Sequence, residues 1–215
     1  MKLYSYFRSS AAYRVRIALN LKGLSYETIP VHLLKEGGQQ FSDSYRAVNP
    51  SQLVPTLVDN DVTVGQSIAI LEYLEETHPQ PPLLPTDAAG RARVRAIAQN
   101  IACDIHPLNN LRVLKYLKHE LGQDDDARNG WYKHWIAVGL GAVEALLADH
   151  PDTGRFCHGD QPGYADACLV PQLFNARRMG CDTSAFPTIM RIDAACTELD
   201  AFCDAAPGSQ PDSEG

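Results

Sequence analysis

Two adjacent serines and three arginines occupy a short stretch near the N-terminus, YFRSSAAYRVRIAL at residues 6–19. Ser9 and Ser10 fall where a strand-like run meets residues with helical spacing. A serine hydroxyl can cap a helix, and with the N–H groups of a first helical turn it can stabilise a thiolate over a thiol. The stretch allows three interpretations: a targeting peptide, a surface helix, or the floor of an active site.

A second anion site is indicated at Gln66 and Ser67, which stand where another helix should begin. The N–H groups and the positive dipole end of a helix favour a carboxylate at that point. Ser67 also occupies the expected N-cap position, and capping and anion binding can use the same turn. His106 and Asn110 are four residues apart and would share one face of a helix. No third or fourth ligand accompanies them, so we predict no metal site.

A sheet and several helices are needed to position these residues. Alternating and β-branched patterns predict strands at residues 2–7, 26–33, 56–58 and 62–64. Pro30 places the second strand at a sheet edge, because proline cannot donate to a ladder. Helices are predicted from the serine pair to Gly23, in a short piece before residue 50, and from Ser67 onward. The expected order is β-α-β-α-β-β-α.

The second half of the chain has helical patterns only. Four prolines stiffen residues 78–87, which we predict to be a linker. Helices follow at residues 88–121, 127–150, 164–179 and 187–202, and the polar tail from residue 206 is predicted to be extended or disordered. We therefore predict an α/β domain at residues 1–82 and an all-α domain at residues 88–215.

Composition restricts the class of protein. The 215 residues carry a formal net charge of -7 with a pI near 5.4, which argues against nucleic-acid binding. No stretch approaches the roughly 20 apolar residues that a membrane span needs. The six cysteines form no CxxC pair, so we interpret them as reduced thiols of a cytoplasmic protein. Before Glu27 there is no acidic residue, which is also typical of a mitochondrial transit peptide. That alternative weakens once the segment is assigned to a strand and a helix.

The domain order and several motifs resemble the cytosolic glutathione transferases. QLVPTL, with Val54 before Pro55, is similar to the family's cis-proline signature, and GQSIAILEYLEE is similar to its γ-glutamyl-binding turn. Further motifs resemble one class of this family, the zeta class, which contains the maleylacetoacetate and maleylpyruvate isomerases. These motifs are RSSAAYRVRIALNLKG, KEGGQQ, NPSQLVPTL, DIHPLNNLRVLKYL, LVPQLFNARR and the terminal QPD. This resemblance covers essentially the whole chain. It implies a thioredoxin-like βαβαββα domain, an all-helical glutathione-transferase domain, and a homodimer.

The resemblance also implies roles for individual residues. Ser9 would be the catalytic serine, with Ser10 as its neighbour. The cofactor, glutathione, would be bound by Gln40, Val54, Pro55, Gln66, Ser67, His106, Asn110 and Arg112. Within that set, the Val54 backbone would pair with the cysteinyl unit across a cis peptide bond, and Gln66 and Ser67 would hold the γ-glutamyl carboxylate.

The implied substrate is a small dianionic maleyl compound. Guanidinium groups pair bidentately with carboxylates, which makes Arg8, Arg14 and Arg178 the candidates to bind it. Arg178 matches the family's substrate arginine better than Arg177. In the implied reaction the glutathione thiolate adds to the cis double bond, the new single bond rotates, and elimination gives the trans fumaryl product. We favour maleylacetoacetate, with maleylpyruvate as the alternative.

The sequence departs from the zeta pattern at Ala11, where those proteins commonly have cysteine. That cysteine is not the thiol that attacks substrate, so we expect activity to survive. Three further hypotheses are a transferase that conjugates or dehalogenates small α-haloacids, a non-catalytic binding module, and a glutaredoxin-like oxidoreductase. Non-catalytic modules typically lose the serine and the γ-glutamyl anchors, and an oxidoreductase needs a cysteine at the strand–helix junction. We therefore expect an enzyme.

Overall fold

The computed structural model describes residues 1–214, which form two compact units. Unit 1 contains Met1–Leu83 together with the C-terminal segment from Thr197, and unit 2 is Leu84–Cys196. This division differs from the predicted one, in which everything after residue 88 belonged to the helical domain. The segment joins unit 1 because its Phe202 is fully buried and the Phe202 carbonyl accepts a hydrogen bond from Tyr13 at 3.2 Å.

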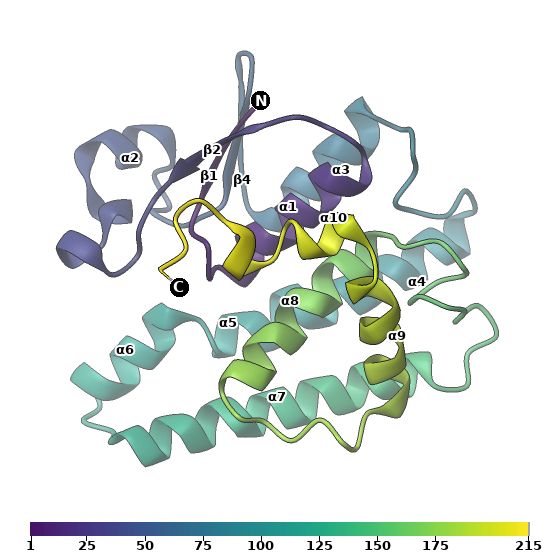
Figure 1. The fold of residues 1–215 in the computed structure, drawn as a ribbon. Helices are drawn as coiled ribbons and strands as arrows, with labels where there is room; N and C mark the ends of the chain where they lie inside the picture. The colour runs from purple at the N-terminus through teal and green to yellow at the C-terminus, as the bar shows by residue number, and fades with distance from the viewer. Residues whose placement is uncertain (215) are drawn as a thin grey trace. The chain divides into compact units, whose positions relative to one another are not determined.

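Unit 1 is built on a four-stranded sheet in the order β2-β1-β3-β4 (Figure 1). The strands are β1 (Lys2–Ser5), β2 (Glu27–Pro30), β3 (Thr56–Asp59) and β4 (Val62–Gly65). β1 pairs in parallel with β2 and antiparallel with β3, and β3 pairs antiparallel with β4. The predicted order is confirmed, and Pro30 does lie on an edge strand.

The helices of unit 1 cover the sheet because its strand residues alternate between two faces. Leu3 and Leu57 are fully buried toward α1 (Ser10–Leu21) and α3 (Ser67–Thr77), which pack against each other. The other face carries Tyr4, whose ring lies 5.7 Å from that of Tyr45 in α2 (Asp43–Val48). Two short 3₁₀ turns, η1 (Lys35–Gly37) and η2 (Gln39–Phe41), lead into α2.

Unit 2 is helical, but the predicted helix at residues 88–121 is wrong. The chain forms α4 (Ala88–Gln99), a π-helical turn η3 (Asn100–Ile105), α5 (His106–Leu108) and α6 (Leu111–His119). Proline at position 107 and the N-capping Asn110 interrupt a pattern whose apolar spacing continues across the break. The interruption lies at the predicted site residues, which is common for π turns.

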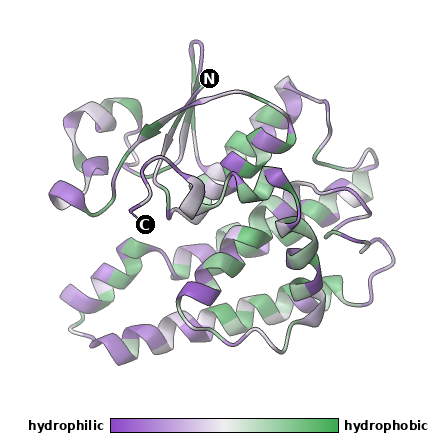
Figure 2. Cartoon of the chain, in the orientation of Figure 1, coloured by the Kyte–Doolittle hydropathy of each residue, from purple (hydrophilic) through white to green (hydrophobic). Residues whose placement is uncertain are grey.

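Three further helices complete the unit: α7 (Asp125–Leu147), α8 (Tyr164–Arg178) and α9 (Pro187–Thr197). α4 packs on α8, and α7 approaches η3 so closely that a Cβ at Gly139 would lie 2.2 Å from Ile105 Cγ1. The first turns of α7 are hydrophilic and its later turns are hydrophobic (Figure 2). Asp124 caps α7 through the Ala127 N–H, so the acidic run at residues 124–126 is a helix start.

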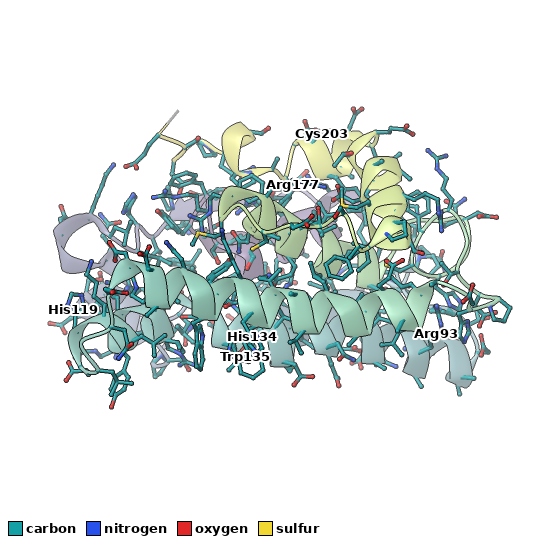
Figure 3. All side chains as sticks on the ribbon, turned by 90° about the horizontal axis from the view of Figure 1, so that it is seen from below. Arg93, His119, His134, Trp135, Arg177 and Cys203 are labelled. Atoms are coloured by element: carbon teal, nitrogen blue, oxygen red, sulfur yellow. The ribbon has the colours of Figure 1, made fainter. Side chains whose placement is uncertain are left out.

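Two side chains fasten the loop before α8. Arg93 of α4, labelled in Figure 3, donates to the Cys157 carbonyl at 2.8 Å and to Thr153 Oγ1 at 2.7 Å. Asp166 accepts from the Gly163 N–H at 2.8 Å and from the Cys157 N–H at 2.9 Å. Asp166 is therefore the side-chain acceptor at the start of α8, although Gly163 has no side chain to complete a capping box.

The prediction of an extended or disordered tail is wrong. After α10 (Asp200–Cys203) the chain forms a 3₁₀ turn, η4 (Pro207–Ser209), in which Pro207 is buried. The Gln210 amide donates to the carbonyls of Asp204 and Ala206 at 2.8 and 3.0 Å. The polar composition that indicated disorder supplies side-chain hydrogen bonds to the backbone instead.

Within residues 1–214, no helix is both long and apolar enough to cross a membrane. The same part of the chain contains no group of three side chains suited to hold a metal ion, and its six cysteines are free thiols.

Candidate functional site

Ser9 lies at the junction of β1 and α1 and is the N-cap of that helix. Its Oγ accepts from the Ala12 N–H at 3.2 Å, and its own N–H donates to the Tyr6 carbonyl at 2.9 Å. Accepting a hydrogen bond uses an oxygen lone pair and leaves the hydroxyl proton to be donated. Ser10 is the first residue of the helix and is buried. Ser9 therefore caps the helix and can still donate to an anion.

Arg16 fixes the loop before Ser9, a role that sequence reasoning missed. This fully buried side chain donates to the Phe7 carbonyl and to Ser5 Oγ, each at 3.0 Å. Burial lowers the pKa of Arg16 to about 10, so the guanidinium stays charged at neutral pH. The available signal was an arginine inside an otherwise apolar helical stretch, because a buried charge must have partners.

Arg8 lies on the aromatic side chains that follow β1. Its Nε and Nη2 donate to the Tyr6 hydroxyl at 3.2 and 2.9 Å, and its guanidinium carbon lies 5.0 Å from the centre of the Phe7 ring. The side chain is only partly buried. Arg8 thus places a fixed positive charge one residue before Ser9.

The start of α3 differs from the prediction. Gln66, not Ser67, is the N-cap residue, and its φ of 66° and ψ of 117° are unusual for a residue with a side chain. Gln66 makes no side-chain capping hydrogen bond to this helix, whose first-turn N–H groups point toward this end. Ser67 is the first helical residue. A carboxylate at this turn would meet those N–H groups and the positive dipole end.

Arg14, which we predicted to bind substrate, is a buried residue of α1. The side chain is 1% exposed, and its Nη1 donates to Ser67 Oγ at 3.2 Å. The arginine lies on the buried face of α1, because Val15, Ala18 and the neighbouring turns are themselves in the core. Its hydrogen bond supports the α3 turn, where its charge also favours an anion, and its role in binding substrate stays a prediction.

Two predicted cofactor residues lie between these helix starts in sequence. The Val54–Pro55 peptide bond is cis, as the resemblance implied. Val54 precedes β3, whose ladder begins at Thr56, so its backbone groups lie outside the paired registers. Gln40 in η2 is 6% exposed, and its Oε1 has no hydrogen-bond partner within residues 1–214. A buried amide of this kind fits a polar ligand such as glutathione.

In unit 2 the structure brings His106 and Asn110 together despite the helix break. Asn110 Nδ2 lies 3.5 Å from His106 Nε2, while Asn110 Oδ1 accepts from the Arg112 N–H at 3.0 Å and caps α6. Arg112 itself is exposed. The pair is therefore ordered by the cap and by the π turn before it, rather than by one continuous helix.

The two arginines that end α8 have different surroundings. Arg177, labelled in Figure 3, forms an ion pair with Asp193 of α9. Arg178 is exposed and interacts with the Tyr132 hydroxyl, whose pKa burial raises to about 12 while Arg178 opposes that rise. Arg177 is thus engaged within unit 2, and the substrate role of Arg178 stays a prediction.

Comparison with known proteins gives consistent similarities. Residues 3–82 match the glutathione S-transferase N-terminal domain family, and residues 136–208 match the corresponding C-terminal domain family. A maleylacetoacetate isomerase of Rattus norvegicus is 49% identical, over 98% of this chain and 94% of the relative.

Solved structures agree closely as well. The holo structure of a maleylpyruvate isomerase, described as a bacterial zeta-class glutathione S-transferase, has a TM-score of 0.96 and 52% identity, covering 99% of this chain and 100% of that one. A maleylacetoacetate isomerase of Methylobacterium extorquens AM1, solved with malonate and glutathione bound, has a TM-score of 0.95 and 41% identity, and each chain is fully covered.

Proposed function

Because the chain belongs to the zeta class of the glutathione S-transferase family, we propose that it is a glutathione-dependent cis–trans isomerase that converts maleylacetoacetate to fumarylacetoacetate. The observation that carries this proposal is Ser9, which caps α1 and keeps a hydroxyl proton to donate. Glutathione, when bound, supplies the nucleophilic thiol. A hydroxyl donor and a helix N-terminus favour its ionised form over the neutral form.

The chain's own residues divide the remaining work. Val54 offers backbone groups outside the sheet ladder, Gln40 offers a buried amide oxygen, and the α3 start offers N–H groups for a carboxylate. We assign further cofactor contacts to His106, Asn110 and Arg112. Arg8 and Arg178 would bind the two carboxylates of the maleyl substrate and stabilise negative charge that develops during addition.

The test of Ser9 uses a second serine cap as its control. Ser42 caps α2 with the same 3.2 Å bond, from the Tyr45 N–H to Oγ, and takes no part in the proposed chemistry. We expect Ser9→Ala to lower kcat for maleylacetoacetate by about a hundredfold, while Ser42→Ala leaves it unchanged. The measurement is glutathione-dependent loss of the substrate's ultraviolet absorbance. Equal activity of the two variants would remove the catalytic role of Ser9.

Maleylpyruvate is the second candidate substrate, and the similarity to a maleylpyruvate isomerase at a TM-score of 0.96 favours it. Values of kcat/KM for both compounds, measured side by side, decide between them. Turnover of neither, together with conjugation of an aryl halide or dehalogenation of an α-haloacid, would contradict the isomerase function.

We also propose that the protein is a cytoplasmic homodimer. Free thiols fit a reducing compartment. On α7, Val138 and Leu146 are 53% and 41% exposed, and an apolar side chain gains by being covered by a second copy. Light scattering after size exclusion gives the mass in solution, and a monomer at micromolar concentration would contradict the dimer.

A further inference from the structure

The peptide groups of Phe7 are held from both sides. The Phe7 N–H donates to Asp212 Oδ2 at 3.0 Å, and the Phe7 carbonyl accepts from Arg16 Nη2 at 3.0 Å. Two residues later, the Ser9 N–H donates to the Tyr6 carbonyl at 2.9 Å. The loop that presents Ser9 is thus fixed by three hydrogen bonds, and one of them comes from a residue more than two hundred positions away in the chain.

Both partners of Phe7 are connected to the C-terminal segment. Arg16 Nε donates to the Ala205 carbonyl at 2.8 Å, which ties the buried guanidinium to that segment. Asp212 follows the η4 turn, where Gln210 satisfies two backbone carbonyls. Figure 1 shows the segment in yellow beside the purple start of the chain. Asp212 is therefore delivered to the loop by ordered structure.

A second contact holds the same segment beyond Asp212. The Glu214 carboxylate lies 2.7 Å from Lys35 Nζ and 3.2 Å from His32 Nε2. The His32 ring in turn packs edge-on against Tyr6, with 4.8 Å between ring centres. Asp212 is thus bracketed by the Gln210 bonds on one side and by the Glu214 contacts on the other.

The charge of Asp212 works against the chemistry of a site that must stabilise an anion. A carboxylate near Ser9 disfavours a thiolate, although the buried Arg16 offsets part of that effect. The useful property of Asp212 is therefore the hydrogen bond that its oxygen accepts. We propose that Asp212 is a positioning residue, which holds the Phe7–Ser9 loop so that the Ser9 hydroxyl meets the glutathione sulfur; this inference rests on the proposed role of Ser9.

Two substitutions of nearly equal shape separate the hydrogen bond from the charge. Asp212→Asn keeps an acceptor oxygen and removes the charge, whereas Asp212→Leu removes both. Ser213→Ala is the matched control, because no hydrogen bond of the Ser213 side chain is found within residues 1–214. A chain ending at Gln210 removes the acceptor together with its neighbours and carries the test if the Leu variant does not fold.

The first measurement is amide hydrogen exchange in the protein without glutathione. We expect the Phe7 amide to exchange at least tenfold faster in Asp212→Leu and in the shortened chain, and at the wild-type rate in Asp212→Asn and Ser213→Ala. The second is the ultraviolet absorbance of the thiolate of bound glutathione, followed against pH. The Leu variant should hold about tenfold less thiolate at a pH below the transition, equivalent to a rise of about one pKa unit.

Unchanged exchange and unchanged thiolate in the Leu variant would overturn the inference, even if its thermal stability fell. Equal loss in the Asn and Leu variants would overturn it too, because the charge would then be the active property. The inference would also be overturned if the wild-type protein binds glutathione without forming thiolate, because the Ser9 hydroxyl would then have no thiolate to stabilise. Thiolate formation without isomerisation of a maleyl substrate would contradict only the proposed function.

Discussion

Ser9 and Ser67 share one arrangement although they begin different helices. Ser9 Oγ accepts from the Ala12 N–H, and Ser67 Oγ accepts from Arg14 Nη1, each at 3.2 Å. In both cases the protein supplies the donor and leaves the hydroxyl proton to be donated. A serine in this state is a directed donor, which suits an anionic ligand such as a thiolate or a carboxylate.

This arrangement predicts a selective effect at Arg14. Replacing it by Met keeps the volume and removes the donor to Ser67, so the γ-glutamyl carboxylate should lose an oriented partner. We expect about tenfold weaker binding of glutathione and unchanged binding of cysteinylglycine, which lacks that carboxylate. Calorimetric titration of both ligands provides the measurement. An equal loss for both would show that Arg14 supports the fold and not the turn.

Sequence alone predicted the positions of these polar residues better than their orientation. The spacing of Ser9 and Ser67 marked two helix starts, and the structure has helices at both. Arg14 and Arg16 were less predictable, because an arginine on the buried face of α1 looks the same in sequence as one that faces a substrate. Only their hydrogen-bond partners distinguish them: Arg14 donates to Ser67, and Arg16 donates to the carbonyls of Phe7 and Ala205.

Among the elements, α3 begins at a residue with an unfavourable backbone conformation. Gln66 has φ 66° and ψ 117°, a region that costs residues with a side chain of the order of 1–3 kcal/mol. The conformation turns the chain from β4 into α3 within one residue, and Gln66 makes no side-chain cap to the helix.

The energetic cost of the Gln66 backbone conformation predicts that glycine is more stabilising than alanine at this position, which reverses their usual order. We expect Gln66→Gly to have a free energy of unfolding about 1 kcal/mol higher than Gln66→Ala, because glycine tolerates positive φ. Urea denaturation measures the difference. At Thr63, exposed in β4, the same pair should have the opposite sign, with glycine the less stable. Glycine less stable at both positions would contradict the strain.

Strands and helices with a clear periodic pattern of apolar residues were predictable from the sequence, and breaks within a helix were not. The strands of unit 1 and the helices α7 and α8 follow their apolar patterns. The break at η3 and α5 escaped prediction, because the apolar residues continue through it while a proline and a capping asparagine change the backbone. The ordered tail was not predicted for a different reason: its polar residues bond to the N-terminal part of unit 1, and composition does not report such partners.

At the scale of the whole molecule, unit 1 consists of two stretches separated by all of unit 2. The C-terminal stretch supplies acceptors to Tyr13, Arg16 and Asn20 of α1, at 3.2, 2.8 and 3.0 Å. Without it each of these polar groups would lose an acceptor in a largely apolar core, which is most costly for the charged Arg16. The sequence motifs gave no sign of this dependence.

Rearranging the chain tests that dependence. We expect residues 1–83 alone to be largely unfolded. A rearranged chain, in which residues 197–214 come first and are joined to residues 1–83 at Met1 by a flexible linker of about 15 residues, should fold cooperatively. Circular dichroism during thermal unfolding distinguishes the two. As a control, Arg16→Met in residues 1–83 should recover part of the structure by removing the buried charge. A cooperative transition in unmodified residues 1–83 would contradict the expectation.

The split of unit 1 has a consequence for how the protein is made. Synthesis of Leu84–Cys196, which is 113 residues (196 − 84 + 1), separates the two stretches and takes about 6 to 23 s at ordinary rates of translation. During that interval unit 2 is free to fold on the ribosome, while the nascent β1–α1 loop still lacks Asp212 and the Ala205 carbonyl. A chain released from a ribosome that stalls within unit 2 would therefore lack the contacts that hold the Ser9 loop.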